Sequence, residues 1–140
     1  MAIAVFPKPE SVGPREWGSE TLLVLAPGKY TLKRIEMKQG AIGGLQFHRL
    51  KDEAGVMISG EMLVRYHVEH NHLAEHICRA GDAFHFPTGA IHQAEALTDC
   101  VYIEASTPHF NDRVHVEHLF AFENEQGGLP TTELSDVETR

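Results

Sequence analysis

The sequence has little of what marks secreted, membrane-spanning or nucleic-acid-binding proteins. Its two cysteines, Cys78 and Cys100, are too few and too far apart for a disulfide framework or a cysteine-rich zinc site, so we expect reduced, buried thiols. The apolar start of the chain lacks a basic segment and reaches Pro7 before a long hydrophobic run develops. We therefore expect no signal peptide, no membrane span and a cytoplasmic protein.

Positive charge is also scarce. The 12 Lys and Arg residues against 20 Asp and Glu give a formal net charge of -8. A nucleic-acid surface needs clustered basic side chains, which these scattered residues do not supply. The expected partners are therefore small molecules, with no nucleic acid and no membrane. At 140 residues the chain is long enough for one domain but too short for two.

The centre of the chain is typical of an all-β protein. From residue 21 to residue 107, short β-branched and aromatic segments alternate with Gly, Pro, Asn or Asp, and no long run of helical period occurs. Even spacing of this kind favours a barrel. Strands are predicted over residues 21–25, 30–37, 45–49, 55–59, 61–69, 73–79, 83–86, 92–96 and 100–106.

The two ends of the chain differ from its centre. Residues 1–18 contain three prolines, which cannot donate to a β-ladder, so we expect an extended N-terminal arm. Residues 19–118 are expected to form the barrel, and residues 119–140 a flexible tail with little to bury. We also expect a homodimer, because barrels of this size often hide an edge strand against a partner and the arm could cross over.

The first of two spaced motifs runs from Gly40 to Gly60. Five residues separate Gly40 from Gln46, and one separates Gln46 from His48. Four residues then separate His48 from Glu53, and six separate Glu53 from Gly60. Residues two apart in a strand point to the same face, so Gln46 and His48 can both point into a barrel. Glu53 is expected on the next strand.

The second motif runs from Gly81 to Ala96. Five residues separate Gly81 from Pro87, and one separates Pro87 from Gly89. Two residues then separate Gly89 from His92, and three separate His92 from Ala96. Pro87-x-Gly89 favours a tight corner, which would turn the chain so that His92 enters the barrel opposite the first motif.

Together these stretches resemble the paired motifs of the cupin superfamily, which read Gly, His-x-His, Glu, Gly and then Gly, Pro-x-Gly, His, Asn. Eight of the ten anchors match, and the departures are Gln46 for the first histidine and Ala96 for the final asparagine. The resemblance implies a single-domain cupin, a double-stranded β-helix or jelly-roll-like barrel. It also implies one divalent metal ion bound by Gln46, His48, Glu53 and His92.

Two imidazoles, a carboxylate and an amide oxygen form a mixed nitrogen and oxygen set, which suits Mn²⁺, Fe²⁺, Co²⁺, Ni²⁺ or Zn²⁺. The lack of thiolates argues against a closed structural zinc site. Four protein ligands on a six-coordinate ion would leave two adjacent positions for a chelating substrate. Many cupins keep the barrel and lose the metal, and Gln46 could be a step in that direction. Against this, His48, Glu53 and His92 all remain.

A glutamine at position 46 is similar to the pattern of cupin sugar isomerases of the phosphomannose isomerase type. Residues 15–20 look like the Trp-Gly-x-Glu entry of those proteins, and residues 103–108 resemble their Glu-x-Ser-Thr-Pro exit. Their exit continues with Asp-x-Val-Arg, where this chain has His115 after the valine and Arg113 before it. The resemblance implies a metal-dependent isomerase or epimerase that acts on a sugar or sugar phosphate through an enediolate.

Such a reaction needs a base to move a proton between adjacent carbons. His85 and Glu104 are the candidates, because a barrel interior could shift the pKa of either toward neutrality. The alternative is that His85 packs in the core and Glu104 forms a salt bridge outside. Lys33 could be an interior cation for phosphate or sugar oxygens, although such a lysine is more often solvated.

Two other functions remain open. An Fe²⁺-dependent dioxygenase would use the same two histidines and carboxylate, with oxygen in the open positions. A non-enzymatic cupin would use the metal only to anchor a carbohydrate. A second metal site is not expected, because the remaining histidine cluster falls on a polar hairpin where it would be solvated. Its members are His67, His70, His72 and His76.

Overall fold

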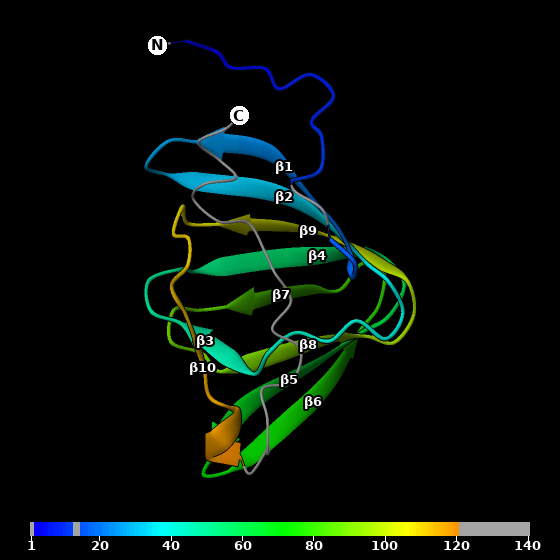
Figure 1. Ribbon diagram of the computed structural model, residues 1–140, viewed down its shortest axis with the longest axis vertical. Coiled ribbons are helices and arrows are strands. Elements are labelled where there is room, and N and C mark those ends of the chain that lie inside the picture. Colours follow the sequence, from blue (N-terminus) through cyan, green and yellow to red (C-terminus); the bar gives the residue numbers. More distant parts are fainter. Residues whose placement is uncertain (1, 13–14, 121–140) are drawn as a thin grey trace.

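The computed structural model describes residues 2–12 and 15–120, which form two facing antiparallel sheets (Figure 1). The first sheet contains, in spatial order, β1 (Gly18–Ala26), β2 (Tyr30–Met37), β9 (Cys100–Ser106), β4 (Glu53–Ser59) and β7 (Ala83–Phe86). The second contains β10 (Arg113–His115), β3 (Gln46–His48), β8 (His92–Ala96), β5 (Met62–Glu69) and β6 (His72–Cys78). The predicted all-β fold is therefore confirmed.

Each predicted strand is present, and the differences lie at the ends of elements. The strand predicted from residue 55 begins at Glu53, which is bonded in register to β7 and β9. The short strand β10 and the 3-10 helix η1 (Glu117–Phe120) were not predicted. Both fall in a segment of mixed His, Pro, Asn and Asp residues, where a three-residue strand leaves no alternating pattern.

The N-terminal arm meets the barrel near the C-terminal end of the arm. Ser11 forms an isolated bridge to Thr21, and Val12 is buried beside β1. Residues before this point extend away from the sheets (Figure 1). The predicted flexible tail, residues 119–140, lies outside the described residues beyond Phe120. Among the described residues no helix has the length and hydropathy needed to cross a membrane.

The inner faces of the sheets form an apolar core at one end of the sandwich. Strand alternation produces it, since buried and exposed residues alternate along β2 from Tyr30 to Met37. The core contains Trp17, Ile35, Met37, Met57, Met62, Val64, Cys78, Ala96 and Cys100. Both cysteines are buried free thiols, as predicted.

The other end of the interior is polar and charged. The alternation that buries Ile35 also buries Lys33, which is only 2% exposed. The Lys33 Nζ lies 3.0 Å from Oε1 of the buried Glu20, and this ion pair offsets the cost of removing either charge from water. The side chains of Glu53 and Glu104 are also buried and lie in the same region. The barrel therefore combines an apolar end with a charged one.

The turn at Gly60 offers a test of the fold, with Gly81 as the matched control. Both have positive φ, +79° and +92°, but a Cβ at Gly60 would collide with the Asp99 carbonyl and lie 2.7 Å from Cα of Cys100. At Gly81 it would meet nothing within 4 Å. We expect Gly81→Ala to lower the free energy of unfolding by about 1 kcal/mol for the left-handed backbone. Gly60→Ala should cost roughly 1–3 kcal/mol more through overpacking.

Urea unfolding followed by the fluorescence of Trp17, the single tryptophan, measures both losses. Equal losses in the two variants would show that the close contact with Asp99 does not constrain this turn.

Candidate metal centre

Three buried side chains converge between the sheets. His48 ends β3, Glu53 begins β4 and His92 begins β8. The Nε2 atoms of His48 and His92 lie 3.5 Å and 3.4 Å from Oε1 of Glu53. Ligand atoms from all three residues lie within 4.8 Å of one another, so one ion can touch them all. The structure thus brings together three of the four predicted ligands.

Hydrogen bonds on the far side of each imidazole fix its orientation. The Nδ1 of His48 donates to Oδ1 of Asp112 at 2.9 Å, and the Nδ1 of His92 donates to the Ala90 carbonyl at 2.9 Å. A ring that donates through Nδ1 presents the lone pair of Nε2. Both rings therefore direct Nε2 toward Glu53, the side on which a metal ion would be bound.

Gln46 completes the set. Its strand pairs it in register with His92, so the two side chains lie on the same face of the sheet, and both line the central cavity. The Gln46 Oε1 atom is buried, and no hydrogen-bond partner for it exists in the described part of the chain. A buried acceptor without a partner is costly, and a cation would satisfy it. The residues present therefore fit a divalent ion with Gln46 as fourth ligand.

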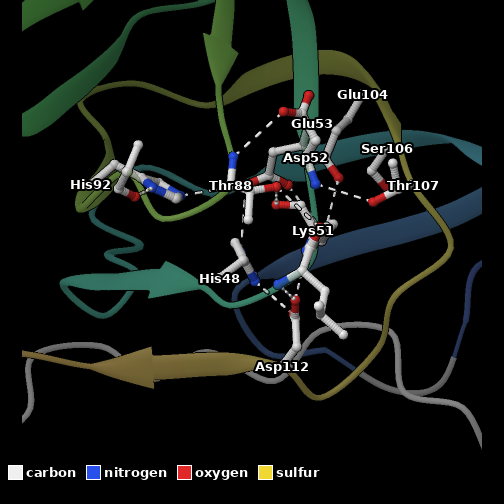
Figure 2. Close-up of polar contacts among 12 residues, drawn as sticks. His48, Lys51, Asp52, Glu53, Thr88, His92, Glu104, Ser106, Thr107 and Asp112 are labelled. Carbon is white, nitrogen blue, oxygen red and sulfur yellow. Dashed lines mark hydrogen bonds and ion pairs between the residues drawn. The ribbon is translucent and has the colours of Figure 1, made fainter.

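Asp112 connects this site to the loop that follows His48. Its Oδ2 accepts hydrogen bonds from the backbone amides of Leu50 at 3.0 Å and Lys51 at 2.8 Å, while Oδ1 holds His48 (Figure 2). Burial would raise the pKa of Asp112, but these three contacts lower it below its usual value. Asp112 is therefore a carboxylate that orients His48. This role of Asp112 was not predicted from the sequence.

Lys51 is a second residue that was missed. Its Nζ lies between two carboxylates, 3.1 Å from Oε2 of Glu53 and 3.5 Å from Oε1 of Glu104. Burial alone would lower the pKa of Lys51, but the charges of Glu104 and Glu53 outweigh it and raise the pKa. Burial would likewise raise the pKa of Glu53, yet Lys51 and the two imidazoles hold it well below its usual range. The Lys51 cation thus keeps Glu53 ionised.

Glu104 projects from β9 into the same cavity. It is 8% exposed and lies across Lys51 from Glu53 (Figure 2). Burial and the negative charge of Glu53 raise the pKa of Glu104 to about 6, against the opposing effect of Lys51 and Lys33. Its carboxyl group is therefore able to exchange a proton near neutral pH.

These groups surround a cavity of about 110 Å³. Its wall combines the metal-site residues with Lys51, Glu104 and Arg113, and it also contains the aromatic side chains of Trp17, Phe86 and Tyr102. Charged and polar side chains in this wall include Glu20, Gln46, Lys51, Glu104, Tyr102 and Arg113.

A family model described as Cupin matches residues 9–126. The chain belongs to the cupin family. No curated protein sequence matches it.

Several solved cupin structures share the fold. CapF, a capsular polysaccharide assembling protein from Staphylococcus aureus, is 23% identical over 74% of this chain and 31% of its own, with a TM-score of 0.66. KdgF from Halomonas sp. is 21% identical over 78% of this chain and 98% of its own, with a TM-score of 0.65. Oxalate decarboxylase from Bacillus subtilis is 19% identical over 81% and 31%, with a TM-score of 0.67. This cupin thus spans about a third of the CapF and oxalate decarboxylase chains.

The cupin barrel separates the two candidate bases. His85 lies on the outward side of β7, where its side chain is 58% exposed and its Nε2 is 2.9 Å from Oδ1 of Asp52. Glu104 faces the cavity instead. Strand parity on β7 turns Phe84 and Phe86 inward, which leaves His85 outside. The prediction that His85 could act as a base in the site is therefore wrong. The alternative that His85 packs in the core is also wrong, as is the alternative that Glu104 lies outside the barrel.

The other residues considered from the sequence also lie either inside or outside the barrel. Lys33 is inside the cupin barrel and not solvated, but its partner is Glu20. The histidines of the β5–β6 hairpin are all exposed, as expected for a polar turn, and comprise His67, His70, His72 and His76.

Loss of an inner ligand should remove metal binding from this cupin. We expect His48→Ala and His92→Ala to weaken Mn²⁺ binding by more than about 100-fold, since even outer partners of metal ligands contribute 10–100-fold. Gln46→Ala should weaken it less, because its amide oxygen is neutral. Titration calorimetry and metal analysis of the purified protein measure this, with His76→Ala on the exposed hairpin as control. Unchanged binding in both histidine variants would refute the site.

The variant Asp112→Asn tests the hydrogen bond between Asp112 and the His48 ring. The amide keeps the size of the side chain but removes the charge that fixes the His48 ring, so we expect Mn²⁺ affinity to fall by roughly 10–100-fold. Folding should persist, which the urea midpoint checks. An affinity within twofold of wild type would show that Asp112 acts only on the loop.

Proposed function

We propose that this cupin is a metal-dependent isomerase or epimerase that acts on a sugar or sugar phosphate. The observation that carries the proposal is Glu104, a buried carboxyl group with a pKa of about 6 that shares one cavity with the metal ligands. A group of that pKa is suited to take a proton and return it at neutral pH. The carbohydrate class is supported by the Gln-x-His pattern at residues 46–48 and by the segments at 15–20 and 103–108.

Gln46, His48, Glu53 and His92 would hold the ion. When bound, a divalent ion supplies the positive charge that stabilises an enediolate and leaves positions for the carbonyl and hydroxyl oxygens of a substrate. Glu104 would take the proton from the carbon next to the carbonyl and return it to the neighbouring carbon.

Lys51 supports this arrangement from between the two acids. It binds Oε2 of Glu53, which leaves Oε1 directed at the imidazoles, and it contacts Oε1 of Glu104. The catalytic carboxylate is thereby held at a fixed distance from the metal ligand. Aromatic residues that line the cavity, among them Trp17 and Tyr102, would exclude water from the reacting carbons.

A specific observation also favours a second candidate. His48, His92 and Glu53 form the two-histidine, one-carboxylate set used by Fe²⁺ oxygenases. In that case activity would require iron and consume oxygen, and Glu104 would not be needed to move a proton. Oxygen uptake measured with the Fe²⁺-loaded protein separates the two.

The proposal is tested by incorporation of solvent deuterium into a panel of aldoses, ketoses and their phosphates, with protein loaded in turn with Mn²⁺, Fe²⁺, Co²⁺, Ni²⁺ and Zn²⁺. We expect Glu104→Gln to lower the exchange rate by about 10²–10⁴-fold, the usual contribution of a positioned base. His85→Gln is the matched control and should stay within twofold of wild type, since His85 faces outward.

Exchange that survives in Glu104→Gln would remove Glu104 from the mechanism. A full metal site with no exchange on any sugar would remove the isomerase and favour a cupin that only binds a carbohydrate.

A further inference from the structure

We infer that Glu117 is a positioning residue of the metal centre, because it fixes the backbone from which Gln46 extends into the cavity. This inference concerns the fourth ligand and rests on the metal site of the proposed function. It does not depend on the isomerase reaction.

Leu45, the residue before Gln46, is held at both of its backbone polar groups. Its N–H donates to Glu117 Oε1 at 3.0 Å, and its carbonyl accepts a hydrogen bond from the Val116 N–H at 2.9 Å. Leu45 is also 0% exposed. Both peptide groups that flank the Leu45 Cα are therefore fixed, and the second of them contains the nitrogen of Gln46.

The Glu117 side chain is buried although its hydrogen-bonding capacity is not filled. It is 2% exposed, and its Oε2 has no hydrogen-bond partner in the part of the chain that the structure describes. The Nδ1 of His115 lies 3.5 Å from Oε1, which is too long for a strong hydrogen bond. Burying a carboxyl group with an unsatisfied oxygen costs free energy. The main contribution of Glu117 is therefore the bond that fixes the Leu45 amide.

The segment that carries Glu117 is also paired to the strand of Gln46. Strand β10 lies along β3 (Figure 1), and its last residue, His115, pairs in register with Gln46. Glu117 follows two residues later and begins η1. One short segment therefore supplies both the strand partner of Gln46 and the anchor of the residue before it.

Gly44 permits the close approach of this segment. A Cβ at position 44 would collide with the His115 ring and lie 3.2 Å from Glu117 Oε1. At Gly43 a Cβ would meet the Ala94 carbonyl oxygen at 3.6 Å, which is an ordinary van der Waals contact. The fit between the Glu117 segment and the chain that leads into β3 therefore leaves no room for a side chain at position 44.

Gln46 depends on the position of its backbone more than the histidine ligands do. The rings of His48 and His92 are each oriented by a hydrogen bond through Nδ1. The Oε1 atom of Gln46 has no such partner among the described residues, and a glutamine side chain has more rotatable bonds than an imidazole. The place of its amide oxygen is therefore set largely by where its backbone lies.

A double-mutant cycle tests whether Glu117 acts through Gln46. Titration calorimetry gives the Mn²⁺ affinity of Glu117→Leu, which removes the acceptor at similar volume, in the wild-type and Gln46→Ala backgrounds. We expect Glu117→Leu to weaken binding by roughly tenfold in the wild-type background, the lower end of the effect of outer partners of metal ligands. In the Gln46→Ala background the loss should be within about twofold, because the ligand that Glu117 positions is already gone.

Two further variants separate positioning from a loss of stability. Glu117→Gln keeps an acceptor oxygen for the Leu45 N–H and should bind Mn²⁺ within about threefold of wild type. Val64→Ala removes methyl groups from the apolar core, outside the cavity wall. It should lower the urea midpoint and change Mn²⁺ affinity by less than about twofold. The visible absorption of bound Co²⁺ reports the ligand set, and Glu117→Leu should shift it in the same direction as Gln46→Ala.

Equal losses from Glu117→Leu in the two backgrounds would overturn the inference, as would an unchanged affinity in that variant or an equal loss in Glu117→Gln. Unchanged affinity in Gln46→Ala would also overturn it, but would leave the site of His48, Glu53 and His92 intact. These measurements involve no turnover, so their failure leaves the proposed isomerase reaction untouched.

If Glu117→Leu does not fold, Gly44→Ala takes its place in the cycle, with Gly43→Ala as the matched control. The added methyl group at position 44 presses on the same contact from the other side. A loss of Mn²⁺ affinity that requires Gln46 and is absent in Gly43→Ala supports the inference. An equal loss in both backgrounds, or no loss, overturns it.

Discussion

The geometry of the metal centre depends on Asp112, one carboxylate that accepts three hydrogen bonds. It receives the His48 ring on one oxygen and two backbone amides of the following loop on the other. The residue comes from the exit segment of the barrel, far in sequence from the first motif. A single side chain thus fixes the orientation of a metal ligand and the path of the loop that carries Lys51. Other contacts secure that loop, since Thr88 Oγ1 donates to the Leu50 carbonyl at 3.0 Å.

The charged end of the barrel is stable because its charges alternate. From the metal centre outward the order is Glu53, Lys51, Glu104, Lys33 and Glu20. Each buried charge therefore has a neighbour of opposite sign. Breaking such a buried pair typically costs about 3–5 kcal/mol, because the remaining charge is left uncompensated. The two acids also differ in pKa, since Lys51 and the imidazoles hold the pKa of Glu53 low while burial and the charge of Glu53 raise that of Glu104 to about 6.

The fold could be predicted from the regular spacing of strands and turns, and the convergence of His48, Glu53 and His92 from their places in the two cupin motifs. These three residues lie at the ends of strands, next to the turn residues of the motifs. Lys51 and Asp112 lie in connecting segments, where no period reveals which side chain points inward. The strand β10 is too short to leave a pattern of its own. Long-range pairing, which only the folded chain shows, brings these residues to the site.

His85 and Glu104 show the same limit within strands. Each was an equal candidate in the sequence, because parity along a strand fixes which residues share a face but not which face is inward. The inner face of β7 was set by the packing of Phe84 and Phe86, and that of β9 by Cys100 and Ser106, both buried on the side of Glu104. The packing of neighbouring side chains therefore determines which face of each strand points inward.

The two departures from the cupin motifs have unequal consequences, because they fall at opposite ends of the interior. Ala96 pairs in register with Met62 and lies in the apolar core, where a small side chain packs without a polar group to satisfy. Gln46 lies in the charged end, where its buried Oε1 has no hydrogen-bond partner among residues 2–12 and 15–120. The first substitution is compatible with the barrel alone. A cation or a hydrogen-bond donor in the cavity would satisfy the second, so Gln46 is compatible with a metal site.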